Sequence, residues 1–298
     1  LYKPAHRAVP RLSAKDPATL MAVTTEHIAA HASRPLPLVQ RVTSSTGFAI
    51  GLYLLVMGAL IYGAYAGAAR MGYNWQWYNI PRYIWTYTED GFQLGELIIG
   101  LGMTFVLSIS SFLLAVLIGL VMALARLSDL VIGKALSLAL LEFLRNMPLL
   151  VLVYLFYYVL GPIFGWDRVT SAILCLGVFH GALLSEIFRA GILSVAQGQW
   201  EGAKSIGMTK TQSYRYIILP QSVPLMLPPL TGEAVQLVKS SAIVSVIAVA
   251  ELTTVGRNLI SETYMSFEIW FTVAVIYLVI TLLMSFGVTA LEKRVAHD

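Results

Sequence analysis

Two glutamate–arginine pairs stand in strongly apolar stretches of the chain and could carry charge chemistry inside a membrane. Glu142 and Arg145 are three residues apart, and Glu186 and Arg189 repeat this spacing. Residues three apart lie on one face of a helix, where opposite charges can pair. A charged side chain within lipid is costly unless it is paired or hydrated. Each pair is therefore either a structural ion pair near the inner membrane boundary or part of a polar path across the membrane.

Further polar side chains accompany these pairs. Pro148 removes a backbone hydrogen bond and predicts a kink beside Arg145 and Asn146, where freed carbonyl groups are tolerated only next to protein or water. The ammonium group of Lys239 either reaches back to the inner membrane surface or faces the path and attracts a carboxylate. The residues predicted to line a translocation path are Arg145, Asn146, Pro148, Glu186, Lys239 and Ser240.

Two other ionisable residues are given structural roles. His180 lies in an apolar stretch and is predicted to be a hydrogen-bonded packing residue rather than a ligand. Glu233 is expected in a loop, because Pro224, Pro228 and Pro229 should break the helix before it.

The motifs of several enzyme classes are missing from the sequence. It contains no phosphate-binding G-x-x-x-x-G-K-[ST] loop, no H-E-x-x-H zinc motif and no G-x-S-x-G nucleophile motif. Cys175 is the only cysteine, so an intrachain disulfide or a thiolate metal cluster cannot form. The net charge of +4 comes without a basic run that would suggest nucleic acid. We predict no catalytic residue, no metal site and no cofactor bound by this chain.

Composition indicates a membrane protein. Of 298 residues, 57% are hydrophobic and 12% are charged, whereas soluble domains have about 25% charged residues. A membrane-crossing helix needs about 20 mostly apolar residues. Such runs predict an all-α integral membrane protein with six spans, over residues 47–69, 94–125, 136–160, 171–193, 234–250 and 269–291. The fifth run is short and is expected to begin earlier, near Pro229, as a broken helix.

The distribution of Lys and Arg predicts the orientation. With both termini inside, the inner segments hold most of the 20 basic residues, as the positive-inside rule requires. Scattered prolines predict a largely disordered inner tail over residues 1–46. A signal peptide is a weaker alternative, because the region before the first apolar run is too long. We divide the chain into this tail, a first span with an outer segment over residues 47–95, and a core over 96–298.

The outer segment between the first two spans is rich in aromatic residues and poor in charge. Its members are Tyr73, Trp75, Trp77, Tyr78, Tyr83, Trp85 and Tyr87. Trp and Tyr collect at the depth of lipid headgroups, because one end of the ring is apolar and the other can stay wet. The segment is predicted to be an interfacial helix or loop resting on the outer leaflet; the alternative is a docking surface for an external binding protein.

One long polar segment, residues 194–221, does not fit into the membrane. Its basic residues place it on the inner side. Trp200 and Ala203 begin a helical repeat that predicts a short amphipathic helix, and Gly207 is expected to end it. Thr209 or Thr211 then caps a second helix that Pro220 ends.

This segment resembles the EAA loop, the signature of binding-protein-dependent ABC importer permeases. The pattern joins Glu, Ala and Gly to an Ile-x-Leu-Pro ending, and the matching residues here are Glu201, Ala203, Gly207, Ile217, Leu219 and Pro220. Gly202 replaces the first Ala of the pattern, which costs the helix about 1 kcal/mol but keeps the position small. The resemblance implies that a separate ATPase docks on Gly198, Gln199, Glu201, Gly202, Ala203 and Gly207.

Three more segments resemble polar amino acid permeases, at residues 142–150, 186–192 and 236–243. Arg145 with Asn146, and the Val-Lys-Ser-Ser-Ala-Ile run that includes Lys239, look most like the glutamate/aspartate import branch. The resemblance covers about residues 97–295. The long N-terminal tail departs from shorter family members.

The resemblance implies a subunit of an ATP-driven importer for polar amino acids in the bacterial inner membrane. Its partners would be two copies of an ATP-binding subunit that carries ATP and Mg²⁺, a second permease subunit of the same or a homologous kind, an external substrate-binding protein and the lipid bilayer. The alternative is an ion-coupled secondary amino acid transporter, which inverted repeats with paired broken helices would favour. A membrane enzyme is disfavoured by the missing motifs.

Overall fold

The computed structural model of this protein describes residues 46–89 and 91–295, apart from the side chains of residue 88 and of residues 291–295. The chain divides into two compact units, Leu1–Asn74 and Trp75–Asp298, and each is described by itself. The tail predicted for residues 1–46 lies outside the described residues except for Thr46.

The first unit contributes one described helix, α3 (Thr46–Arg70). Its 25 residues are apolar enough to cross a membrane, and none of its side chains is buried. The predicted first span over residues 47–69 is confirmed.

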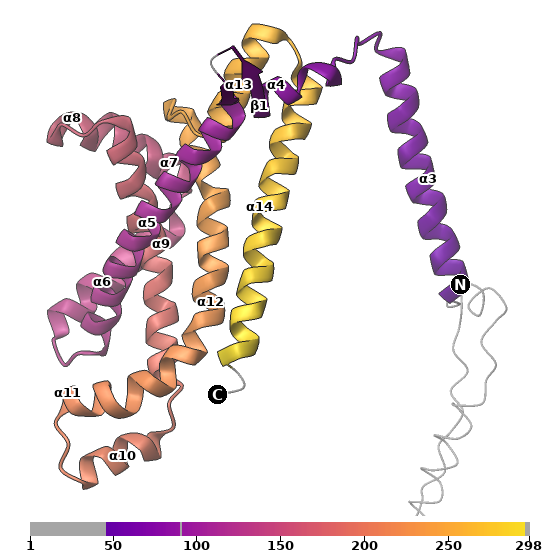
Figure 1. Cartoon of the computed structure of the whole chain (residues 1–298). Helices are drawn as coiled ribbons and strands as arrows, with labels where there is room; N and C mark the ends of the chain where they lie inside the picture. The colour runs from indigo at the N-terminus through magenta and orange to yellow at the C-terminus, as the bar shows by residue number, and fades with distance from the viewer. Residues whose placement is uncertain (1–45, 90, 296–298) are drawn as a thin grey trace, which may run out of the picture. The chain divides into compact units, whose positions relative to one another are not determined.

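Four long helices form the frame of the second unit (Figure 1), namely α5 (Glu96–Leu127), α9 (Arg168–Leu193), α12 (Leu219–Ser240) and α14 (Ser266–Val295). Together with α3, five stretches are long and apolar enough to cross a membrane. A sixth is added if α6 (Val131–Asn146) and residues 149–164 form one bent span. The all-α membrane class and the predicted number of crossings agree with this frame.

Short elements lie at the two ends of the frame (Figure 1). At one end are α10 (Gln197–Ser205), α11 (Lys210–Ser213) and the π-helical turn η3 (Tyr214–Ile218), and we call this the loop end. At the opposite end, the hairpin end, are η1 (Trp77–Asn79), α4 (Pro81–Ile84), α13 (Leu252–Thr263) and an antiparallel hairpin of β1 (Trp85–Thr88) and β2 (Gly91–Leu94). The connecting elements are α7 (Leu149–Tyr154), η2 (Leu155–Leu160), α8 (Gly161–Phe164) and η4 (Ser241–Ile247).

Helices α5 and α9 run side by side with their backbones in close contact. A Cβ atom added to Gly119 would lie 2.9 Å from the carbonyl oxygen of Gly181, and one added to Gly181 would lie 2.9 Å from Cβ of Ile118. Only glycine fits such an approach without a shift of the helices. At the end of the same contact, Arg126 of α5 forms an ion pair with Glu186 of α9. The two helices therefore pack as one tight pair.

Pro148 breaks the third predicted span rather than kinking it. Met147 takes an extended backbone, as residues before proline commonly do. The helices on either side of this break are bent by 108°. The prediction of one kinked helix over residues 136–160 was therefore wrong in its geometry, although the proline was correctly identified as its cause.

The prolines of α12 do not break that helix, which corrects the expectation for the fifth span and for Glu233. Pro224, Pro228 and Pro229 all lie inside α12, and the membrane-crossing stretch runs from Lys210 to Ile247 instead of over residues 234–250. The hydroxyl of Thr231 donates to the carbonyl of Leu227 at 2.9 Å. Prolines are tolerated in membrane helices because neighbouring groups and local π-helical turns satisfy the freed backbone carbonyls, and the π-helical turn η3 directly precedes α12.

Candidate functional site

Helix α10 presents one face to the rest of the chain and leaves the other open. Ala203 is buried, and the ring of Trp200 meets that of Tyr214 edge-on with centroids 5.2 Å apart. On the open side, Gly198 and Gly202 have no atom within 4 Å of an added Cβ. Gln199 and Glu201 are also exposed. The helix thus offers a surface of small and polar residues that the described part of the second unit does not cover.

Gly207 ends α10 as predicted, and the hydrogen bonds show how. Its φ is +78°, a left-handed conformation in which most side chains are strained. The N–H of Gly207 donates to the carbonyl of Lys204 at 3.0 Å, and that of Met208 to the carbonyl of Ala203 at 3.1 Å. This pair of bonds is the Schellman motif, which satisfies the last carbonyls of a helix.

The second helix of the loop begins at Thr209 but does not stop at Pro220. The N–H of Gln212 donates to the Thr209 hydroxyl at 3.3 Å, and the N–H of Thr209 donates to the Gln212 side chain at 2.9 Å. Of the two threonines considered, Thr209 is the cap. The chain then passes through η3 into α12, where Pro220 lies in the first turn. Proline is tolerated there because the first N–H groups of a helix have no partner within it.

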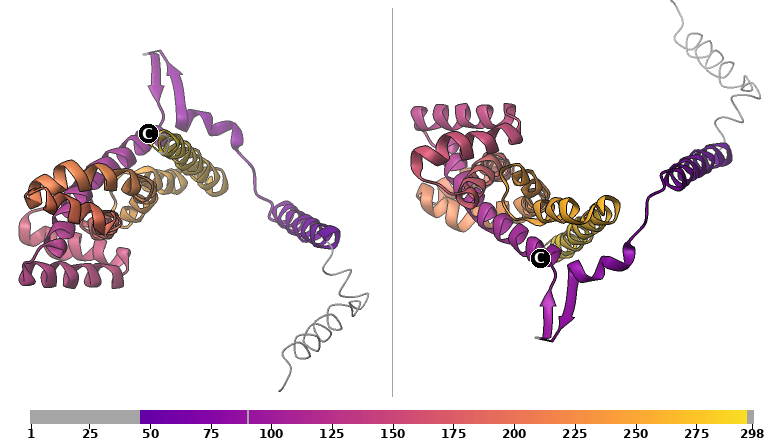
Figure 2. Two further views of the ribbon diagram at one scale, coloured as in Figure 1. Left: turned by 90° about the horizontal axis from the view of Figure 1, so that it is seen from below. Right: turned by 90° about the horizontal axis from the view of Figure 1, so that it is seen from above.

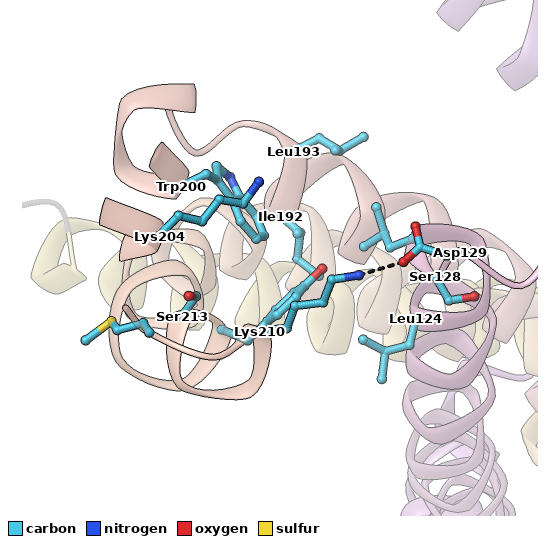
Figure 3. A pocket seen from close by; sticks show the side chains of 12 residues that line it. Leu124, Ser128, Asp129, Ile192, Leu193, Trp200, Lys204, Lys210 and Ser213 are labelled. Carbon is cyan, nitrogen blue, oxygen red and sulfur yellow. Dashed lines mark hydrogen bonds and ion pairs between the residues drawn. The ribbon is translucent and has the colours of Figure 1, made fainter. Parts of the chain in front are cut away.

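A pocket of about 490 Å³ lies between the loop and the adjacent ends of α5 and α9 (Figure 3). Across it, the Lys210 ammonium donates to the Asp129 carboxylate at 2.6 Å, and both side chains are exposed. Lys210 holds the pKa of Asp129 below its ordinary value, through this hydrogen bond and its charge. Asp129 lies in the turn between α5 and α6, so this ion pair joins the loop to the long helices.

The glutamate–arginine pairs behave differently from one another. Glu186 pairs with Arg189 at 3.3 Å, as predicted, and also with Arg126. The expected pair of Glu142 and Arg145 does not form. Instead, the amide of Asn146 donates to the Glu142 backbone carbonyl at 2.7 Å and to its carboxylate at 3.4 Å. This local bond uses the shorter side chain and leaves Arg145 exposed.

The six residues proposed for a path lie on different elements: Arg145 and Asn146 on α6, Pro148 directly before α7, Glu186 on α9, and Lys239 and Ser240 on α12. Within residues 46–89 and 91–295, no ion pair or hydrogen bond between helices joins any two of Arg145, Asn146, Glu186 and Lys239 to each other. Lys239 is exposed in the last turn of α12 rather than at the start of a span, and Ser240 beside it is buried.

His180 is a hydrogen-bonded packing residue, as predicted, but its partner was not foreseen. Its Nδ1 lies 2.6 Å from Oε1 of Glu233, and the imidazole is buried. Glu233 reaches it because α12 stays helical through its prolines. Two further partners were not predicted: Asp129 for Lys210, and Arg126 for Glu186. Asp129 is 81 residues from Lys210 in sequence, and the one signal for it was an acidic residue between two apolar runs.

The family described as "Binding-protein-dependent transport system inner membrane component" matches residues 115–297. This range includes the whole loop, α9, α12, α14 and the last part of α5. The chain belongs to this family.

As an inner membrane component of this kind, the chain has relatives with known assignments. It is 35% identical to the glutamine transport system permease protein GlnP of Escherichia coli, over 66% of this chain and 92% of the relative. It is 29% identical to the glutamate/aspartate import permease protein GltJ of the same organism, over 68% and 88%. The crystal structure of an amino acid ABC transporter with histidines matches at a TM-score of 0.63 and 38% identity, covering 67% of this chain and 94% of that one.

Proposed function

We propose that this chain is the permease subunit of an ATP-driven importer for polar amino acids, and that loop 194–221 docks its ATPase. The observation that carries the proposal is the open face of α10, where Gly198 and Gly202 let another backbone approach closely. The loop lies in the part of the chain that matches the family. The ATPase would bind ATP and Mg²⁺ on a separate subunit, in two copies.

The assembly would also contain a second permease subunit, the same or homologous, and an external substrate-binding protein. The proposed orientation has both termini inside, which puts the loop end in the cytoplasm and the hairpin end outside. Arg145, Asn146, Pro148, Glu186, Lys239 and Ser240 remain the proposed contributors to the translocation path; a second permease subunit would supply its opposite wall.

The substrate class is inferred from relatives that transport glutamine and glutamate or aspartate. Glutamate/aspartate import is the finer proposal, supported by the sequence around Arg145 and Lys239 and by GltJ. GlnP has the higher identity, so glutamine is the competing substrate. Uptake of labelled glutamate, aspartate and glutamine by the reconstituted complex would compare the three directly.

The coupling role is tested by two substitutions in α10 and its cap. Gly207→Asp should abolish uptake and substrate-stimulated ATP hydrolysis, because it adds a charged side chain at the docking surface, where glycine leaves room for another backbone. Gly202→Leu should do the same for a different reason, since it adds a side chain only to the open face. Gly207→Asn is the control for charge, because Asn and Asp have nearly the same size and both tolerate the left-handed region; this variant should lose less uptake than Gly207→Asp.

All three variants should insert into membranes in normal amounts. Normal uptake by both Gly207→Asp and Gly202→Leu would refute the docking proposal. Uptake by proteoliposomes that contain this chain alone, driven by an ion gradient, would instead establish the secondary transporter.

A further inference from the structure

The hairpin of β1 and β2 has one apolar face that the described residues of the second unit leave uncovered. Trp85 pairs with Leu94 and Tyr87 with Phe92 in the register of the two strands. Alternate residues of a strand point to the same side, so these four side chains form one face, which we call the apolar face. The rings of Tyr87 and Phe92 are 5.4 Å apart, and each of the four residues is more than half exposed.

The opposite face is polar. Thr86 pairs with Gln93 there. A two-stranded hairpin is marginally stable by itself in water, so a face with this much exposed apolar surface needs an apolar surrounding. Apolar and polar side chains therefore alternate along both strands, as expected for a strand pair at a boundary between a polar and an apolar medium.

The chain fixes this hairpin at the end of the membrane-crossing helices. Gly95 alone separates β2 from α5, and its N–H donates to the carbonyl of Ile84 at 2.9 Å. Tyr83 is buried in a cluster with Leu97 of α5 and Ile269 of α14. The hairpin thus cannot move far from the plane in which α5 and α14 leave the membrane.

The strands extend sideways from that point. Seen along the long helices, with α14 close to end-on, the hairpin projects away from the helices of the second unit (Figure 2). Residues 85–94 contain no Lys or Arg, and Glu89 and Asp90 at the turn are the charged residues of this stretch. Attraction to anionic headgroups therefore contributes nothing here, and contact must come from burial of the apolar side chains.

We propose that the apolar face of the hairpin lies in the interfacial region of the lipid leaflet at the hairpin end. Trp and Tyr favour this depth, where the ring is in an apolar layer and the polar atom reaches water. In the orientation proposed above this is the outer leaflet, but the inference depends only on the membrane embedding of α5 and α14. The lipid contact of the hairpin can be refuted while the transport proposal holds, and the transport proposal can be refuted while the lipid contact holds.

The test uses the full chain in phosphatidylethanolamine–phosphatidylglycerol proteoliposomes, with the buried Cys175 replaced by alanine. A fluorophore is attached at Tyr87→Cys, on the apolar face, or at Gln93→Cys, on the polar face; both positions are exposed. Lipid with a nitroxide near the headgroup should quench the label at 87 several-fold more than the label at 93. Aqueous iodide should show the reverse order, and added salt should change neither result.

Other outcomes overturn the proposal. Equal quenching of both labels by iodide would place the hairpin in water. Protection of the label at 87 from iodide without quenching by lipid would show that protein covers the face, either another part of this chain or a second copy. Loss of lipid quenching on addition of salt would show an electrostatic contact instead of an apolar one.

Discussion

The two ends of the long helices are fastened by different chemistry. At the hairpin end, Glu251 and Glu268 are fully buried. Glu251 accepts hydrogen bonds from the N–H groups of Thr253 and Thr254, and Glu268 accepts one from the N–H of Gln76 at 2.6 Å. At the loop end, the polar link is the exposed ion pair of Lys210 and Asp129, and it stands beside apolar packing that includes Trp200 and Tyr214.

These attachments differ in what it costs to break them. A buried acceptor that loses its donors keeps the full penalty of burial, whereas an exposed ion pair exchanges its partner for water at little cost. The hairpin end is therefore built as a fixed region. The polar link at the loop end can be exchanged for contacts with water at little cost, which suits a docking surface that must transmit movement.

The largest effect on stability should come from Glu251→Ala. The substitution leaves two N–H groups at the start of α13 and the hydroxyl of Tyr277, which donates to Glu251 at 3.0 Å, without their acceptor. We expect a loss of about 3 kcal/mol, measured as a lower thermal midpoint of the purified protein in detergent. Glu251→Gln keeps one acceptor oxygen and should lose less. An unchanged midpoint for Glu251→Ala would remove the contrast between the two ends.

Trp200→Ala should separate coupling from stability. The change removes the contact with Tyr214 that orients α10, so substrate-stimulated ATP hydrolysis by the complex should fall several-fold. The thermal midpoint should change far less than with Glu251→Ala, because Trp200 is only partly buried. Trp200→Phe is the matched control and should retain coupling. A large fall in the midpoint would show that the loop end is also a structural anchor.

The two ends should respond to pH with opposite sign. Burial raises the pKa of Glu251, so its contribution to stability is complete below the ordinary Glu value of about 4.3 and is lost as the pH rises through the raised value. Asp129 has a lowered pKa, so the small contribution of its exposed ion pair is complete above the ordinary Asp value and is lost as the pH falls through the lowered value. Thermal midpoints across pH should show the first effect in the wild type and not in Glu251→Gln; identical profiles would contradict it.

The smallest effect is expected from Asp129→Asn. Both partners of its ion pair are exposed, so the thermal midpoint should not change measurably. Uptake should fall modestly, because the loop loses its link to the α5–α6 turn. The exchange of both charges, Asp129→Lys with Lys210→Asp, should restore uptake. Failure of the exchange to restore it would show that the pair contributes something other than attachment.

The sequence was sufficient where a local rule decides the structure. Apolar length located α3, α5, α9 and α14, and Gly207 predicted the end of α10. The prolines show the limit of local rules: Pro148 separates two helices by 108°, while Pro224, Pro228 and Pro229 stay within one. The same residue type has two outcomes, so the difference must come from packing across helices, which spacing along the chain does not contain.

Long-range pairs were beyond sequence reasoning for the same reason. His180 and Glu233 meet only because α9 and α12 cross at that level. The hairpin was also missed: a short aromatic run fits an interfacial helix as well as two strands, and the pairing register is decided only when Gly95 bonds back to Ile84.

The close pairing of α5 and α9 makes a single mechanical unit out of two helices. Three residues separate the end of α9 from the start of α10, so a displacement of α10 is transmitted first to α9. The contact of Gly119 with Gly181 and the Arg126–Glu186 ion pair leave α9 no room to slide along α5. Both helices are therefore expected to tilt together as one rigid body. Gly95 joins the far end of α5 to the hairpin. The pair of helices would therefore rotate about a point in the leaflet at the hairpin end.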